Sequence, residues 1–203
     1  MKNLTIQTDS TAELLVSKSK FVAYSFFVET TEKANFQLQS LQKQCADATH
    51  ICFAYVVDGK EKCSDDGEPQ GTAGRPILEC IKKNHLQNVL IAVVRYFGGI
   101  KLGTGGLIRT YNKMASLAIN LSGTKQICQC KKISFCVDVT QNKKVVQIQK
   151  MPNVIDSQVQ YLQDKISICF FAEEDFLNDL FANLKNLFGQ NLTFCIDPKV
   201  YSR

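Results

Sequence analysis

The chain has 203 residues, of which 45% are hydrophobic and 21% charged, so it can bury a core and is too hydrophobic to be a disordered protein. Its net charge of +5 is compatible with a polyanionic partner, but so small an excess is also typical of an ordinary solvated surface. No apolar run reaches the roughly 18 residues of a membrane span, and the first residues lack the basic and apolar regions of a secretory leader. We therefore expect a cytoplasmic protein without a membrane partner.

Repeated strand and helix patterns organise the first half of the chain. Aromatic and β-branched residues predict strands at 20–28, 50–57 and 88–97, and helical spacing predicts helices at 31–45, 77–83 and 104–120. Phe36, Leu38 and Leu41 are the expected inward residues of the first helix. The pair Asp58-Gly59 predicts a hairpin turn toward a strand near Cys63. The run 88–97 is almost wholly apolar, which favours a strand covered on both faces.

A different order of elements follows Gly123, which is placed to end a helix. We predict strands at 131–139, 153–160, 164–172 and 192–196, and helices at 141–150 and 173–189. The last helix has its apolar residues at Phe176, Leu180, Leu184 and Leu187. The order βαββαβ is that of the ferredoxin-like arrangement. We therefore predict an α+β protein with one domain at 1–125, a ferredoxin-like domain at 131–203 and a boundary between 123 and 131.

Nine cysteines raise the question of disulfides or zinc. Their number is odd, and several lie inside apolar runs, as Cys52 and Cys169 do, so we expect most to be small buried thiols. The only close pair, Cys128 and Cys130, has a single intervening residue, and the CxxC spacing of a zinc site is absent. We expect no metal and no other cofactor.

Eight of the 11 glycines are concentrated in two segments, SDDGEPQGTAGRP at 64–76 and RYFGGIKLGTGGLIRTY at 95–111. Glycine permits positive φ and close backbone approach. Such clustering is typical of places where backbone amides bind a ligand or where two loops pack tightly. We expect the two segments to meet, either as a binding cleft or as a scaffold held by ion pairs.

The second segment lies between a predicted strand and a predicted helix, a context in which amides and a helix N-terminus bind phosphate. Its spacing fits neither common nucleotide fingerprint, because Thr104-Gly105 stands where a P-loop needs Lys-Ser/Thr and the third glycine of a dinucleotide loop is missing. A looser site for RNA phosphates and a purely structural turn both stay open. The candidate phosphate-binding residues are Arg95, Tyr96, Gly98, Gly99, Lys101, Gly103, Gly105, Gly106 and Arg109.

Aromatic residues interleave with these arginines, as on surfaces that bind single-stranded nucleic acid. The alternative is that they belong to the core. We favour the core for Phe97 and find the two interpretations equally balanced for Tyr96 and Tyr111.

Acidic residues of the first segment form the other side of the expected cleft. Asp65, Asp66 and Glu68 could bind magnesium or act as acid and base. We favour turn capping and pairing with Arg75, Arg95 or Arg109 instead.

A histidine at the start of a predicted strand completes this list. His50 shares a strand face with Cys52, but a Cys/His nucleophile needs a third, orienting group that the sequence does not show. We favour a structural His50, and the expected cleft partners are His50, Asp65, Asp66, Glu68 and Arg75.

Both glycine-rich segments, with KSKF at 18–21 and DATHICFAY at 47–55, closely resemble the signature of the IMPACT/YigZ family. The length is similar to that of two-domain bacterial members, and the departures at Thr110 and Asn112 are small. The resemblance implies an N-terminal domain folded like the second domain of a small-subunit ribosomal protein and domain IV of elongation factor G. It also implies a C-terminal ferredoxin-like domain.

The family resemblance also bears on function. Eukaryotic members regulate translation by competing for the activator of a stress-responsive initiation-factor kinase, and the fold of bacterial members suggests nucleic-acid or ribosome binding. Some relatives carry the label of proline dipeptidase, which needs a cluster of His and carboxylate metal ligands that this sequence lacks.

Our leading hypothesis is a non-enzymatic regulator of translation that associates with RNA or the ribosome through the basic glycine-rich loop. One alternative is an enzyme or binding protein for a phosphorylated small molecule. Another is a protein-interaction module that acts on a translation factor or a translation-linked kinase.

Overall fold

The computed structural model describes residues 3–151, 153–197 and 200–202, and the chain forms two compact units at 1–126 and 127–203. The prediction of an α+β protein is confirmed. The assignment of 1–125 and 131–203 as domains stays a prediction, because two compact units need not fold independently.

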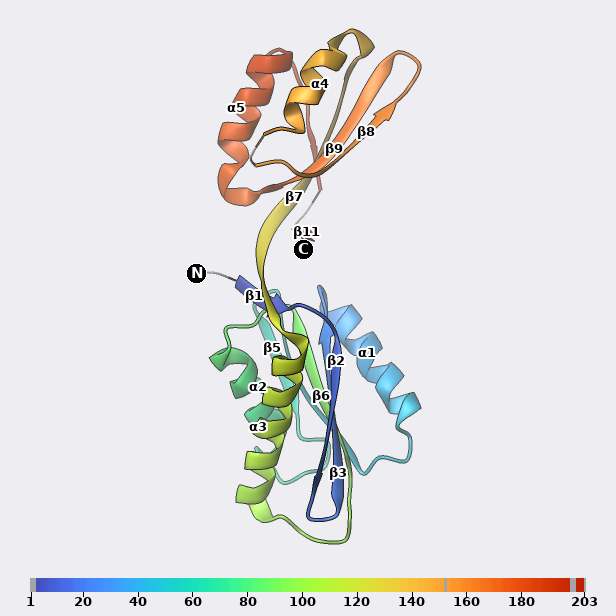
Figure 1. The fold of residues 1–203 in the computed structure, drawn as a ribbon, viewed down its shortest axis with the longest axis vertical. Coiled ribbons are helices and arrows are strands. Elements are labelled where there is room, and N and C mark those ends of the chain that lie inside the picture. Colours follow the sequence, from blue (N-terminus) through green and yellow to red (C-terminus); the bar gives the residue numbers. More distant parts are fainter. Residues whose placement is uncertain (1–2, 152, 198–199, 203) are drawn as a thin grey trace. The chain divides into compact units, whose positions relative to one another are not determined.

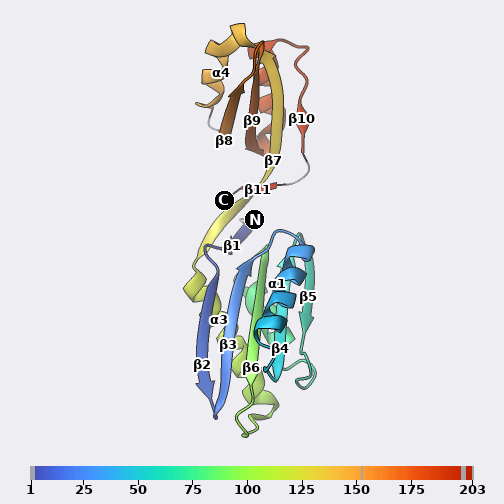
Figure 2. The same ribbon diagram turned by 90° about the vertical axis from the view of Figure 1, so that its right-hand side faces the viewer.

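The first unit is built on a five-stranded antiparallel sheet in the order β2-β3-β6-β4-β5 (Figures 1 and 2). Helices α2 and α3 cover one face of this sheet and α1 covers the other. The elements of the unit are β1 (Asn3–Ile6), β2 (Ser10–Val16), β3 (Ser19–Phe27), α1 (Thr31–Gln44), β4 (His50–Val57), β5 (Lys60–Ser64), α2 (Gly74–Lys83), β6 (Val89–Tyr96) and α3 (Gly103–Ser122).

The central strand β6 is covered on both faces, as its apolar run predicted. Val89, Ile91 and Val93 pack on the side of α2 and α3. Leu90 and Ala92 pack on the side of α1. Because successive side chains of a strand alternate between faces, the strand's last residues also divide between the two sides.

The prediction for the inward face of α1 is partly wrong. Leu38 and Leu41 are buried, but Phe36 is 70% exposed. Residues that lie two apart on a helix do not face the same way, and the buried stripe passes through Ala34, Leu38 and Leu41. Phe36, two residues from both Ala34 and Leu38, therefore lies on the solvent side.

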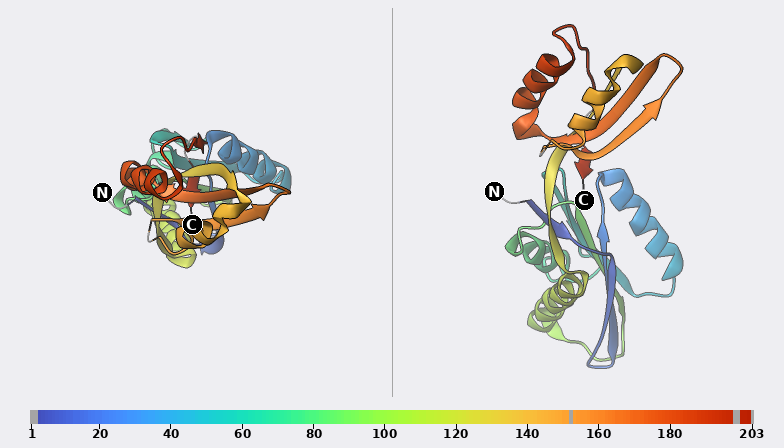
Figure 3. Two further views of the ribbon diagram at one scale, coloured as in Figure 1. Left: turned by 90° about the horizontal axis from the view of Figure 1, so that it is seen from above. Right: turned by 45° about the horizontal axis from the view of Figure 1, so that its top comes forward.

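The second unit has the predicted βαββαβ order, with its strands arranged β10-β7-β9-β8. Helices α4 and α5 share a core with one face of that sheet (Figure 3). The elements are β7 (Thr124–Asp138), the 3₁₀ turn Val139–Gln141, α4 (Asn142–Ile148), β8 (Ile155–Tyr161), β9 (Lys165–Glu173), the 3₁₀ turn Glu174–Phe176, α5 (Leu177–Phe188), β10 (Cys195–Ile196) and β11 (Val200–Ser202).

Three details of the second unit differ from the prediction. Strand β7 begins at Thr124 rather than at residue 131, and β11 adds a short pairing to it. Helix α5 begins at Leu177 rather than at residue 173, and Phe176, which lies in the preceding 3₁₀ turn, is 41% exposed, while Leu180 and Leu184 are buried. Only half of the eight cysteines with described side chains are buried: Cys45, Cys52, Cys80 and Cys130.

Within the described residues, no helix combines the length and the hydropathy needed to cross a membrane.

The turn after β6 packs tightly against the β2–β3 hairpin. A Cβ atom at Gly98 would lie 1.9 Å from the backbone oxygen of Lys18, so only glycine fits there. The amide of Gly98 donates a hydrogen bond to Ser19 Oγ at 3.1 Å. Gly98 therefore serves packing between two loops.

We predict that Gly98→Ala lowers the free energy of unfolding by about 2–3 kcal/mol, because the added methyl group must displace backbone atoms. Urea unfolding measures the change. Gly105→Ala is the matched control in the same segment, since a Cβ there meets only the Arg109 side chain and alanine favours a helix. A Gly98→Ala protein as stable as the control would contradict this packing.

Candidate functional site

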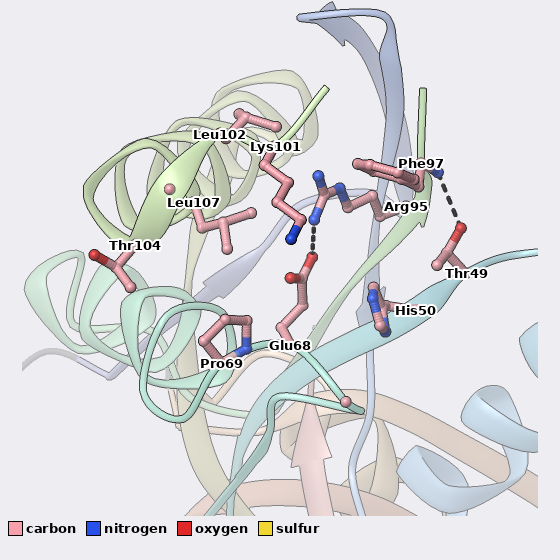
Figure 4. A pocket seen from close by; sticks show the side chains of 12 residues that line it. Thr49, His50, Glu68, Pro69, Arg95, Phe97, Lys101, Leu102, Thr104 and Leu107 are labelled. Atoms are coloured by element: carbon pink, nitrogen blue, oxygen red, sulfur yellow. Dashed lines mark hydrogen bonds and ion pairs between the residues drawn. The ribbon is translucent and has the colours of Figure 1, made fainter. Parts of the chain in front are cut away.

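The two glycine-rich segments meet, and a pocket of about 460 Å³ lies between them at one end of the first unit's sheet (Figure 4). Strands β4 and β6, the loop before α2 and the N-terminus of α3 all contribute to its walls. The lining residues are Thr49, His50, Gly67, Glu68, Pro69, Arg95, Phe97, Lys101, Leu102, Gly103, Thr104 and Leu107.

A row of three paired residues sets the position of this pocket. Arg95 of β6 lies opposite Phe21 of β3 on one side and His50 of β4 on the other. Arg95 is near the end of β6, on the face covered by α2 and α3. The strand register thus places the Arg95 guanidinium at the boundary between the apolar core of that face and the pocket.

Glu68 joins the two segments. Arg95 Nη1 donates to Glu68 Oε1 at 2.6 Å, and the Tyr111 hydroxyl donates to the same oxygen at 2.7 Å. The ion pair is buried, with side-chain exposures of 5% for Arg95 and 3% for Glu68. Burial, together with the neighbouring Cys52 and Glu68, raises the pKa of Tyr111, so its hydroxyl stays protonated and can donate.

The guanidinium of Arg95 also contacts two aromatic rings. Its central carbon lies 5.3 Å from the ring centre of Phe21 and 5.4 Å from that of Phe97. Such contacts stabilise a cation that is removed from water. Arg95 Nε nevertheless has no hydrogen-bond partner among the described residues, although Arg95 as a whole is only 4% exposed.

Asp65 organises the acidic loop from within. Its carboxylate accepts hydrogen bonds from the amides of Gly71, Ala73 and Gly74 at 2.8–2.9 Å. Partial burial raises the pKa of Asp65, but the three amide donors outweigh it and hold the pKa below its usual 3.8. Asp65 therefore shapes the loop and the start of α2, the turn-capping role that we favoured.

Asp66 and His50 attach this loop to β4. Asp66 Oδ2 accepts from the amide of Ile51 at 2.6 Å, and His50 Nδ1 lies 2.7 Å from the backbone oxygen of Asp66. Because a carbonyl oxygen only accepts, His50 Nδ1 carries the proton, and in the neutral ring Nε2 is left as an acceptor.

Cys52 does not form a nucleophilic pair with His50. Its thiol lies 2.9 Å from the backbone oxygen of Asp65 and 3.4 Å from the Tyr111 hydroxyl. Burial raises the pKa of Cys52 to about 12, so the thiolate is scarce at neutral pH. The described residues also contain no cluster of three or more His, Cys, Asp or Glu side chains that could hold a metal ion.

The N-terminus of α3 has no side-chain cap. The first amides of a helix lack partners within it and carry partial positive charge, so they attract anions. Gly103 and Thr104 of this first turn line the pocket, and the side chain of Lys101 points toward the Glu68–Arg95 pair (Figure 4). Lys101 is exposed and has no ion pair or hydrogen bond among the described residues.

The candidate residues named from the sequence divide into two groups. Those that line the pocket are His50, Glu68, Arg95, Lys101 and Gly103. Those that do not are Asp65, Asp66, Arg75, Tyr96, Gly98, Gly99, Gly105, Gly106 and Arg109. That any residue of either group binds a ligand stays a prediction.

Two arginines named from the sequence lie outside the pocket. Arg75 is exposed and pairs with Glu79 on its own helix at 3.1 Å. Arg109 is exposed, and its guanidinium lies beside Gly105 in the first turn of α3. We proposed three arginines as partners of the acidic loop. Among the described residues, Arg95 forms an ion pair with that loop, through Glu68, and Arg75 and Arg109 do not.

The three aromatic residues occupy different surroundings. Tyr96 follows Arg95 on the strand and therefore faces the opposite side, where a hydrogen bond with Cys45 and partial burial raise its pKa to about 12. Tyr111 is fully buried. The assignment of Phe97 to the core is wrong, since this residue is 46% exposed and lines the pocket beside Arg95.

Comparison with known proteins places this site within a family. Residues 17–119 match the Impact N-terminal domain. "IMPACT family member YvyE" of Bacillus subtilis is 45% identical over 122 residues, which cover 59% of this chain and 56% of that protein. "IMPACT family member YigZ" of Escherichia coli is 34% identical over 116 residues, covering 55% and 57%. The chain thus aligns with about half the length of these relatives.

A eukaryotic relative and a solved structure extend the comparison. "Protein IMPACT" of Mus musculus is 34% identical over 94 residues, covering 42% of this chain and 29% of that protein. A crystal structure described as that of a hypothetical protein superposes with a TM-score of 0.70 at 24% identity. It covers 96% of this chain and 97% of that one, which shows the fold.

We predict that Arg95→Met lowers the free energy of unfolding by about 3–5 kcal/mol, because it leaves the Glu68 carboxylate buried without its cation. Urea unfolding of the single variants and of Glu68→Met/Arg95→Met measures this, and the double variant should be more stable than either single one. Arg75→Met, which breaks an exposed pair, is the control and should cost less than about 1 kcal/mol. An Arg95→Met protein as stable as this control would show that the fold does not depend on the pair.

Proposed function

The chain belongs to the IMPACT family, and we propose that it is a non-enzymatic, cytoplasmic regulator of translation that contacts RNA or the ribosome by holding a phosphate group at this pocket. One observation carries the proposal: the uncapped N-terminus of α3 lies beside Lys101 at the edge of the pocket. The translational role rests on the family resemblance, and a translation-factor protein is a further partner in that role. The phosphate contact rests on the geometry.

The charges of the pocket support an anionic ligand. Arg95 and Glu68 neutralise each other in their buried pair, so neither adds net charge to the site. Lys101 then supplies an uncompensated positive charge, and the first amides of α3 add the positive end of a helix dipole. Arg109 lies beside the same turn and can contact a neighbouring phosphate of a strand.

Arg95 has a different role in this proposal from the one expected for it. Its guanidinium is committed to Glu68 and to two aromatic rings, and it is almost wholly buried. A phosphate that approaches the pocket meets Lys101 first. We therefore assign direct phosphate contact to Lys101 and a supporting role to Arg95.

We predict that Lys101→Ala weakens binding to single-stranded RNA and reduces the slope of log affinity against log salt concentration by about 0.7, the value of a single phosphate contact on a single strand. Fluorescence anisotropy at several salt concentrations measures both quantities. Lys43→Ala, at an exposed lysine in the last turn of α1, is the matched control and should leave the slope unchanged. Absence of RNA binding even at low salt would overturn the proposed function.

A second candidate, a binding protein for a phosphorylated small molecule, is favoured by the size of the pocket. A volume of about 460 Å³ is within the range of small-ligand sites. A ligand that binds only the folded state raises the melting temperature, by an amount set by its concentration relative to Kd.

We predict that nucleoside monophosphates at millimolar concentration shift the melting temperature by less than about 1 °C, because a mononucleotide lacks the neighbouring phosphate that Arg109 can contact in a strand. Differential scanning fluorimetry measures the shift. The unphosphorylated nucleosides are the control. A concentration-dependent rise of several degrees with the phosphorylated compounds alone would replace the RNA proposal with this second candidate.

A further inference from the structure

We infer that the pocket takes one unpaired nucleotide of an RNA strand, with its phosphodiester at Lys101 and the first turn of α3 and its base against Phe97. This inference rests on the proposed function and adds the class of ligand. The site then recognises a single strand or a loop, since a base within a duplex cannot reach a pocket wall.

The ring of Phe97 is the observation that points to a base. It is 46% exposed although it lines a pocket, and the Arg95 guanidinium, 5.4 Å from its centre, can cover only one of its faces. The amide of Phe97 donates to Thr49 Oγ at 2.9 Å, which fixes the backbone that carries the ring. An aromatic ring held in place beside a cation, with part of its surface open, is the platform on which nucleic-acid bases stack.

Polar groups in the wall of the pocket point to a ligand with hydrogen-bonding edges. Arg95 lines the pocket and is only 4% exposed, and its Nε–H has no acceptor among the described residues. His50 Nδ1 donates to the backbone oxygen of Asp66, which in the neutral ring leaves Nε2 as an acceptor. A base or ribose can satisfy groups of this kind, whereas an apolar ligand cannot.

The size and the charge of the pocket limit the ligand further. About 460 Å³ is room for one nucleotide and too little for a duplex. With Arg95 and Glu68 paired, Lys101 leaves one positive charge, which matches the single negative charge of a phosphodiester. A terminal phosphomonoester carries about −1.5 to −2 at neutral pH, more than the single charge of Lys101 balances. An internal nucleotide of a strand is therefore the better match.

Anisotropy with two labelled RNA strands of equal length, one uniform and one abasic, tests the inference. The wild-type chain should bind the strand with bases about ten-fold more tightly, as base stacking on an aromatic ring provides. Phe97→Ala should lose this preference and keep its salt dependence, while Lys101→Ala should weaken binding to both strands by the same factor. Phe97→Leu retains apolar volume without a π-face and should behave like Phe97→Ala, which separates stacking from packing.

Phe36→Ala is the matched control, because that phenylalanine is exposed on α1, on the other side of the sheet. Equal binding of the two strands, or equal binding of a hairpin duplex and a single strand, would overturn the inference and leave the proposed phosphate contact intact. A mononucleotide that competes as strongly as the strand would also overturn it. Failure of every strand to bind at low salt would instead overturn the proposed function itself.

Discussion

The buried carboxylate of Glu68 is the group on which the architecture of the site depends. It accepts hydrogen bonds from Arg95 at the end of β6 and from Tyr111 in α3, so it connects the acidic loop to both elements that flank the second glycine-rich segment. Its exposure and that of Arg95 are too small for water to solvate either charge alone. The Arg95–Glu68 ion pair therefore holds the two loops in position, and removal of either residue should disturb their arrangement.

This ion pair also decides which groups are left for a ligand. Arg95 is among the residues that the sequence pattern suggested for phosphate, yet the fold uses its charge to neutralise Glu68. In the proposed function, phosphate contact therefore falls to Lys101 and to the amides at the start of α3, which have no side-chain cap. The result is a small site with one uncompensated charge rather than a broad basic groove, and that difference favours recognition of a single phosphate.

Periodicity was sufficient to predict the strands, the helices and the βαββαβ order, because each of these depends on residues close in sequence. The same alternation rule, applied beyond Val94, would have placed Tyr96 away from Arg95 and Phe97 beside it. The choice of Glu68 as the partner of Arg95 was not predictable in this way. Asp65, three residues earlier, is occupied by the amides of Gly71, Ala73 and Gly74, and that depends on the conformation of the whole loop.

The glycines of the two segments show why composition alone did not separate scaffold from site. Gly98 is required where the turn after β6 meets the backbone of Lys18, whereas Gly103 lines the pocket at the uncapped start of α3. The polar residues divide in the same way. Asp65, Asp66, Glu68 and Tyr111 all have partners within the fold, while Lys101 projects into the pocket without a partner among the described residues, and Phe97 keeps nearly half of its surface open there. Lys101 and Phe97 are therefore the groups that the fold leaves accessible to a ligand, and the paired residues around them keep the pocket in shape.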